Sequence, residues 1–231
     1  MNNFFRLVLS LVLVSVSSAN ASAGMIVNGS FETFEVVNGF PTTFGDWGID
    51  TAGIVSGENG INPFDGNQML KFGATFLNGG TTGLSSDVGQ LVDMGGAQTL
   101  RASAWFNRVP GDSQTDTEFR ISIRAFTGTP ATFGDGTGFI AEHSSTLISD
   151  GDVTTWQQLT TEITLPANAD YILIGLSAVE NIFNDSSPPE FDGHYADLVS
   201  LEVVSSVPEP SSLFLLGSGA IASLWRLRRR R

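Results

Sequence analysis

One stretch of the chain combines an aromatic ring with basic groups that could hold a ligand. Trp105 lies among Arg101, Arg120 and Arg124, and four of the five basic residues between positions 24 and 207 fall within 101–124. A tryptophan offers a flat apolar face to the C–H side of a sugar ring, and arginine offers forked donors to hydroxyls or carboxylates. These four residues fall on the outward faces of two predicted strands that could be neighbours, so they predict a ligand surface that binds glycan.

The same residues have a structural interpretation. Trp105 could pack within a second apolar face of the fold. We also expect Trp47 and Trp156 to pack in the core or at an edge and not to bind a ligand. The arginines could then pair with nearby carboxylates, namely Asp112, Asp116 or Glu118. The exposure of Trp105 separates the two interpretations.

The sequence lacks recognisable catalytic motifs. Its two histidines, His143 and His194, stand far apart, and neither has a nucleophile motif beside it. We find no Gly-x-Ser-x-Gly, no His-Glu-x-x-His and no phosphate-cradling glycine loop. The many carboxylates make close pairs inevitable, as a glycoside hydrolase needs, but a Glu-x-Asp-x-x-Glu signature is absent. We therefore expect that the protein is not an enzyme.

Charge and cysteine content exclude several classes of protein. The 231-residue chain has no cysteine, which excludes thiol catalysis, iron–sulfur clusters and cysteine zinc sites. Positions 24 to 207 hold five basic and 23 acidic residues, a net charge of −18. Such a surface repels phosphate backbones, so we expect no nucleic-acid partner. It suits divalent cations or neutral sugars, although solubility alone would explain most of the carboxylates.

The segments that position these residues have the pattern of short strands. Apolar and polar residues alternate with a period of two over 118–126 and again over 100–107. Further strands are predicted at 68–72, 87–92, 138–143, 156–165, 171–179 and 195–204. Turns bearing Gly and Asp separate them, and sustained helical periodicity is missing. These features predict an all-β fold, a β-sandwich, in one domain over residues 24–206.

The order of several short phrases narrows the fold. Ile-Val-Asn-Gly-Ser-Phe-Glu stands at 26–32, Phe-Asp-Gly-Asn-Gln-Met-Leu at 64–70, Trp-Gln-Gln-Leu at 156–159 and Tyr-Ala-Asp-Leu-Val-Ser-Leu at 195–201. This succession resembles the galactose-binding-like jelly roll found in carbohydrate-binding modules, and it spans nearly all of residues 24–206. The resemblance implies a jelly-roll β-sandwich, but the fold does not fix a ligand.

The same resemblance implies one structural calcium ion. In many such modules the glutamate of the opening phrase and an aspartate of the closing strand meet at one edge, and here these are Glu32 and Asp197. Backbone carbonyls near Ser30 and the Asp65–Gln68 turn would add to the set of about six to eight oxygen ligands that calcium takes. The alternative is that both carboxylates only hydrogen-bond to local backbone. The acidic loop 185–192 could bind a second cation or form a pocket rim, with a solvated loop as its alternative.

Both ends of the chain carry targeting patterns. Residues 1–23 have one positive charge, an apolar stretch and small residues suited to cleavage, the layout of a secretory signal peptide. Residues 207–231 begin Val-Pro-Glu-Pro, continue as an apolar segment at about 212–225 and end in an arginine-rich block. Pro208 and Pro210, on either side of Glu209, cannot lie inside a helix, so they mark a hinge before the apolar helix. That transmembrane helix would span about 21 Å, short of the roughly 30 Å hydrocarbon core.

The order of Pro208-Glu209-Pro210, apolar helix and terminal arginines closely resembles the PEP-CTERM sorting signal of Gram-negative bacteria. The resemblance implies export through the Sec machinery, a transient or weak inner-membrane anchor and cutting near the Pro-Glu-Pro by an exosortase-type sorting enzyme. Such substrates are commonly linked to exopolysaccharide or biofilm production. The alternative is an ordinary C-terminal single-pass anchor.

Together these patterns predict an exported, non-catalytic protein of the cell envelope or extracellular matrix that binds a glycan, matrix exopolysaccharide above all. A structural or adhesive envelope protein without a sugar site is the alternative, and a glycoside hydrolase is a third. An exposed Trp105 flanked by Arg120 would favour the first, and a buried Trp105 the second. A carboxylate pair about 5–10 Å apart in a groove would favour the third.

Overall fold

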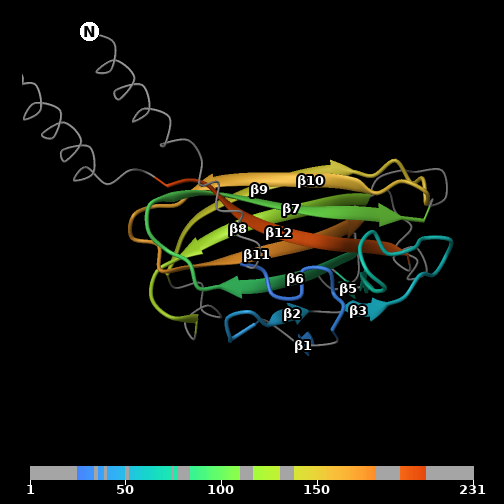
Figure 1. The fold of residues 1–231 in the computed structure, drawn as a ribbon, viewed down its shortest axis with the longest axis horizontal. Helices are drawn as coiled ribbons and strands as arrows, with labels where there is room; N and C mark the ends of the chain where they lie inside the picture. Colours follow the sequence, from blue (N-terminus) through green and yellow to red (C-terminus); the bar gives the residue numbers. More distant parts are fainter. Residues whose placement is uncertain are drawn as a thin grey trace, which may run out of the picture.

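The polypeptide folds into two β-sheets packed face to face (Figure 1). The computed structural model describes residues 25–33, 36–38, 41–49, 52–73, 75–76, 84–109, 117–130, 138–180 and 193–206. Within these ranges the chain forms twelve strands, β1 to β12.

The larger sheet has seven strands in the order β1–β2–β6–β11–β8–β9, with β5 also paired to β6. Their bounds are β1 Val36–Asn38, β2 Trp47–Ile49, β5 Thr75–Phe76, β6 Leu84–Val92, β8 Thr117–Phe126, β9 Phe139–Ile148 and β11 Tyr171–Glu180. Neighbouring strands are antiparallel, except that β1 and β2 are parallel.

The smaller sheet has five antiparallel strands in the order β10–β7–β12–β4–β3. Their bounds are β3 Ala52–Val55, β4 Met69–Phe72, β7 Gln98–Arg108, β10 Gln157–Thr164 and β12 His194–Ser206. From β6 onward the chain changes sheet at every connection except the one between β8 and β9. Strands that are neighbours in the five-stranded sheet therefore come from distant parts of the sequence.

The core lies between the sheets because each long strand alternates apolar and polar residues. One cluster of buried side chains includes alternate residues of β7 and of β8, namely Leu100, Ala102, Ala104, Phe106, Phe119, Ile121, Ile123 and Ala125. The polar residues between them face away from the core. The prediction of an all-β sandwich is confirmed.

The eight predicted strands are all present, and the short strands β1, β2, β3 and β5 were not predicted. Residues 1–23, 185–192 and 207–231 lie outside the described residues, so the signal peptide, the acidic loop, the apolar segment and the domain boundaries stay predictions. No helix within the described ranges has the length and hydropathy needed to span a bilayer.

The expectation that Trp105 and the arginines of the following strand lie on neighbouring strands is wrong. β7 belongs to the five-stranded sheet and β8 to the seven-stranded sheet. Arg101 and Trp105 therefore face outward on one side of the sandwich, and Arg120 and Arg124 face outward on the other. A period-two pattern shows which residues point out, but not which sheet their strand joins.

Candidate functional site

The outward side of β10, β7 and β12 carries a regular array of mostly polar side chains. The strand registers place nine residues in three rows across these strands, namely Gln158–Trp105–Asp197, Thr160–Ser103–Ser200 and Glu162–Arg101–Glu202. We call these nine residues the outer array. Residues directly opposite each other on adjacent strands have neighbouring side chains, so each row can act as a unit.

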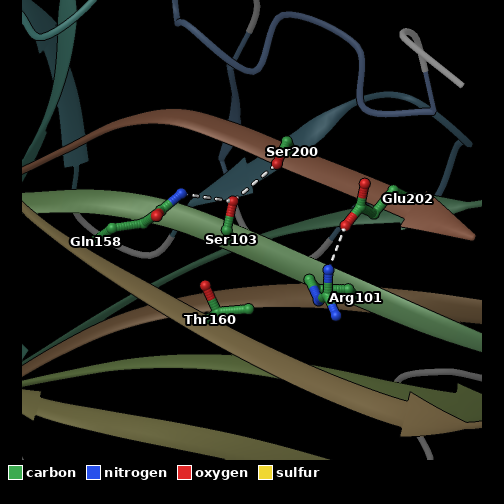
Figure 2. A pocket seen from close by; sticks show the side chains of 6 residues that line it. All are labelled: Arg101, Ser103, Gln158, Thr160, Ser200 and Glu202. Atoms are coloured by element: carbon green, nitrogen blue, oxygen red, sulfur yellow. Dashed lines mark hydrogen bonds and ion pairs between the residues drawn. The ribbon is translucent and has the colours of Figure 1, made fainter. Parts of the chain in front are cut away.

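An open hollow of about 520 Å³ lies over six members of the outer array, namely Arg101, Ser103, Gln158, Thr160, Ser200 and Glu202. Figure 2 shows Ser103 between Gln158 and Ser200. The Oγ atoms of Ser103 and Ser200 share a hydrogen bond of 2.9 Å, and Gln158 Nε2 donates to Ser103 Oγ at 3.3 Å. Within the described part of the chain, the Gln158 carboxamide oxygen accepts no hydrogen bond, so it is open to a ligand hydroxyl.

The row at one end of the hollow holds Arg101 between two carboxylates. Arg101 Nε and Nη2 both contact Glu162 Oε1 at 2.5 Å, and Nη1 contacts Glu202 Oε1 at 3.0 Å. Hydrogen bonding and charge, from Glu162 first and then Glu202, raise the pKa of Arg101 above its usual range. The three ionised side chains carry a net charge of −1, so this row is not a free cationic site.

Three aromatic rings gather at the other end of the outer array. The Phe64 ring stacks on Trp105 with 4.1 Å between centroids and 16° between planes, and the Trp156 ring meets Phe64 edge-on at 6.1 Å. Both tryptophans are half-buried, whereas Phe64 is 39% exposed. We call these rings the aromatic stack. Its most exposed ring belongs to Phe64, and Trp105 supports that ring from one face.

The loop that carries Phe64 is held from below by Asp197. Asp197 Oδ2 accepts hydrogen bonds from the backbone N–H groups of Phe64 at 2.8 Å and Asp65 at 3.0 Å. Its Oδ1 accepts a third from the N–H of Leu198 at 2.7 Å. Asp197 is fully buried, and this burial raises its pKa to about 6 although the three N–H donors favour the charged form.

Glu32 holds the far end of the same loop. Its Oε1 accepts hydrogen bonds from the N–H groups of Asn67 at 2.7 Å and Gln68 at 2.9 Å, and these bonds, Gln68 first, lower the pKa of Glu32. Gly66 lies between the anchored positions with φ +67°, and a Cβ there would stand 2.3 Å from Glu32 Oε1. The carboxylate therefore fits against this loop only because position 66 is glycine.

Glu32 and Asp197 both bind the loop over residues 64–68, which contains Asp65. Ser30 lies in the turn just before Glu32. Both carboxylates, however, face backbone N–H groups, whose positive ends satisfy a negative charge and repel a cation. Among the described residues, no three His, Asp or Glu side chains converge to hold a metal. The geometry favours loop anchoring, and the calcium site at Glu32, Asp197, Ser30 and Asp65 stays a prediction.

Arg120 and Arg124 lie on the outward side of the seven-stranded sheet, away from the outer array. Glu142 on β9 contacts both, at 2.6 Å to Arg120 Nη2 and 3.3 Å to Arg124 Nε. This partner differs from the carboxylates that the sequence had offered, two of which, Asp112 and Asp116, lie outside the described residues. These two arginines therefore do not contribute to a site with Trp105.

Sequence reasoning found three members of the outer array, Trp105 and Arg101 as ligand residues and Asp197 as a metal ligand, and missed the rest. Alternation within 156–165 contains a signal for Gln158, Thr160 and Glu162, whereas in β12 a register shift between Asp197 and Ser200 breaks the period of two. What the patterns could not show is that β10 and β12 flank β7, because those pairings join segments about 50 to 100 residues apart. Phe64 was missed because it lies in a loop, where no periodicity applies.

Several solved structures are similar to the chain, all at low sequence identity. A family 61 carbohydrate-binding module, TmCBM61, solved in complex with β-1,4-galactotriose, is 16% identical, and the match covers 79% of this chain and 99% of that one with a TM-score of 0.49. The C-terminal family 22 carbohydrate-binding module of Clostridium thermocellum Xyn10B is 14% identical over 72% and 91%, with a TM-score of 0.41. The enzymatically active domain of bacteriophage CBA120 tailspike protein 4 is 11% identical over 78% and 21%, with a TM-score of 0.46.

No curated protein sequence matches the chain significantly. One family model does match, at the C-terminus, over residues 206–231. Its first residue is the last residue of β12, so the motif follows the sandwich directly. Residues 206–231 are a PEP-CTERM protein-sorting motif, which implies that the chain is an exported, surface-sorted protein processed by an exosortase.

Proposed function

We propose that the protein is a non-catalytic, glycan-binding protein of the cell surface or extracellular matrix, and that polysaccharide binds along the outer array. The observation that carries this proposal is a hollow lined by hydroxyl, carboxamide and paired ionic groups beside an aromatic stack whose Phe64 ring is exposed. A sugar ring has polar edges and an apolar C–H face, so it matches such a combination of groups. The change of sheet at every connection but one from β6 onward supports a jelly-roll description of the body.

The aromatic stack and the outer array would contact different parts of the ligand. A sugar ring would stack on Phe64, which Trp105 holds in place at 4.1 Å. The next rings would lie over Gln158 and the Ser103–Ser200 pair, which offer donors and acceptors to ring hydroxyls (Figure 2). Ligand contacts are therefore spread over three strands, as suits a chain rather than a single sugar.

The sorting motif supports this assignment because it delivers the protein to where polysaccharide is accessible. Matrix exopolysaccharide is the ligand that this placement favours. Export through the Sec machinery and a transient stay in the inner membrane belong to the same proposal.

A structural or adhesive role without a sugar site is the second candidate. The observation that favours it is the stacking of Phe64 on Trp105, because this contact covers one face of the tryptophan that a sugar would otherwise use. Under this alternative the aromatic stack only closes the end of the sheet, and its removal would change stability but not ligand binding.

Affinity electrophoresis of the exported chain, purified in mild detergent, separates the two candidates. Gels would contain β-galactan, xylan, β-glucan or mannan. We expect at least one polymer to retard the protein, and Phe64→Ala to weaken retardation at least about tenfold, which is about 1.4 kcal/mol. Phe44→Ala is the matched control, because Phe44 is also 39% exposed but contacts Tyr171 instead. Equal retardation of both variants, or none by any polymer, would contradict glycan binding at this face.

A further inference from the structure

We propose that the outer array selects uncharged polysaccharide and rejects polysaccharide that bears carboxylates. This inference rests on the proposed function and adds the chemical class of the ligand. Two observations support it. Arg101 is paired with Glu162 and Glu202 in the row at one end of the hollow, and the adjacent row, Thr160–Ser103–Ser200, has no charged side chain.

Arg101 is the cation to which a sugar carboxylate would be expected to bind, and among the described residues it is the only basic one that lines the hollow. Both sides of its guanidinium are already engaged, by Glu162 through Nε and Nη2 and by Glu202 through Nη1. A carboxylate on the ligand would have to displace one of these glutamates. The forked donors that make arginine a carboxylate receptor are therefore used within the protein.

A ligand carboxylate near this row would also meet two negative charges against one positive charge. Glu202 lines the hollow, and Glu162 is exposed beside Arg101, so both negative charges lie close to the space that the ligand would occupy. The wider surface adds to the repulsion, because residues 24–207 carry a net charge of −18. Both parts of the repulsion weaken with salt because the charges are exposed, and the longer-range part weakens most.

The rest of the hollow is suited to hydroxyl groups. Ser103, Ser200, Thr160 and Gln158 are uncharged, and each can both donate and accept hydrogen bonds. A neutral sugar hydroxyl has the same dual capacity, so it can join the Gln158–Ser103–Ser200 chain without leaving a charge unpaired. The uncharged part of the lining therefore matches neutral sugars, and the row that contains Arg101 disfavours acidic sugars.

The test uses pairs of polymers that differ only in charge. The exported chain in mild detergent would run through gels containing β-galactan, β-glucan or mannan, and through gels containing the same polymers after oxidation of their C6 hydroxymethyl groups to carboxylates. Alginate and polygalacturonate would serve as naturally acidic polymers. We expect a neutral polymer to retard the protein, and its oxidised form to retard it at least about tenfold less at low salt.

A gain-of-binding variant makes the test specific to the array. Glu162→Gln removes one of the two carboxylates on Arg101 and should recover much of the lost binding to the oxidised polymer. Glu142→Gln is the matched control, because it removes an arginine-bound carboxylate from the other sheet and should recover nothing. Unchanged melting temperatures would confirm that both variants fold.

The possible outcomes separate the proposed selectivity for uncharged polysaccharide from the proposed glycan binding itself. Tighter binding of acidic than of neutral polymers by the unmodified protein would overturn the selectivity and leave glycan binding standing. Equal recovery in Glu162→Gln and Glu142→Gln would overturn the role of the Arg101 row. Failure of every polymer, neutral or acidic, to retard the protein would overturn the proposed function itself.

Discussion

Asp197 is a residue at which charge and burial conflict. Its carboxylate is fully buried in the outer array beside Trp105, yet it accepts three backbone hydrogen bonds, two of them from the loop that carries Phe64. Burial dominates and raises its pKa to about 6. A side chain that the sequence offered as a metal ligand therefore acts in the structure as the support of an aromatic residue.

This conflict predicts a pH dependence of stability. An unfolded aspartate has a pKa of about 3.9, so between about pH 4 and pH 6 the native state binds more protons at Asp197 than the unfolded state does. The contribution of Asp197 to the free energy of unfolding should fall as the pH rises through this window, by up to about 3 kcal/mol.

Urea unfolding of the unmodified chain and of Asp197→Asn across pH 4–7 measures this contribution. It is the difference between the two proteins in how steeply the free energy of unfolding changes with pH. Other carboxylates cancel in the difference, including Glu32, whose lowered pKa acts in the opposite direction. Parallel pH profiles of the two proteins would show that Asp197 does not titrate in this window, and would contradict the assignment.

At the scale of elements, the loop over residues 64–68 links the segment before β1 and the strand β12 to the site. Glu32, from the segment before β1, and Asp197, from the last strand, both bind its backbone. The position of Phe64 therefore depends on the loop's anchors as much as on its stacking with Trp105.

Gly66→Ala should break the anchoring. The left-handed backbone at φ +67° costs about 1–3 kcal/mol for a side chain, and the new Cβ would displace the Glu32 carboxylate. We expect a lower melting temperature together with faster amide exchange at Asn67 and Gln68 and weaker retardation by polysaccharide. Gly96→Ala is the control, because Gly96 also has a positive φ, +80°, but its Cβ would contact nothing. If both variants bind equally well, the loop anchors do not position the ligand site.

The calcium proposal concerns the same two carboxylates and has a separate test. A cation at about 100 times its dissociation constant stabilises the native state by about 2.7 kcal/mol, which should raise the melting temperature by about 5 °C or more. Glu32→Gln should abolish the rise. Identical melting in calcium and in chelator would instead leave Glu32 and Asp197 as loop anchors alone.

The elements themselves were largely predictable from the sequence. Alternation of apolar and polar residues, together with the turns between segments, located eight of the strands, because a strand with one buried face shows a period of two. The short strands β1, β2, β3 and β5 carry at most four residues, too few to show a period on their own. β4 is equally short, but it follows a turn marked by Asp65, Gly66 and Asn67. The pairing of strands was not predictable, because crossing between sheets leaves no local trace. For this reason Trp105 and Arg101 were identified correctly as outward-facing residues and then assigned the wrong neighbours, Arg120 and Arg124.

At the scale of the whole molecule, the sandwich and the sorting motif meet without a spacer. β12 ends at Ser206, where the PEP-CTERM motif begins. Residue Ser206 still pairs with Gln98 on β7, so the last strand pairing lies at the residue where the motif starts.

Deletion of residues 207–231 should therefore release a folded protein. We expect the shortened chain to appear in the medium rather than the surface fraction, with the melting temperature and polysaccharide retardation of the full chain. Cell fractionation and thermal melting of the released protein measure both effects. Unchanged surface retention would contradict sorting through the motif, and loss of the melting transition would contradict a fold that closes at Ser206.

The central claim is that polysaccharide covers the outward side of β10, β7 and β12. Hydroxyl-radical footprinting of the exported chain, with and without the polymer that retards it, tests this most directly. It reports the exposure of individual aromatic side chains, and Phe44 and Phe139, at 39% and 48% exposed on the seven-stranded sheet, calibrate the radical dose. We predict that bound polymer protects Phe64 and Trp156 and leaves Phe44 and Phe139 unchanged. Protection of Phe44 and Phe139 with Phe64 unchanged would place the glycan on the opposite face and contradict the site.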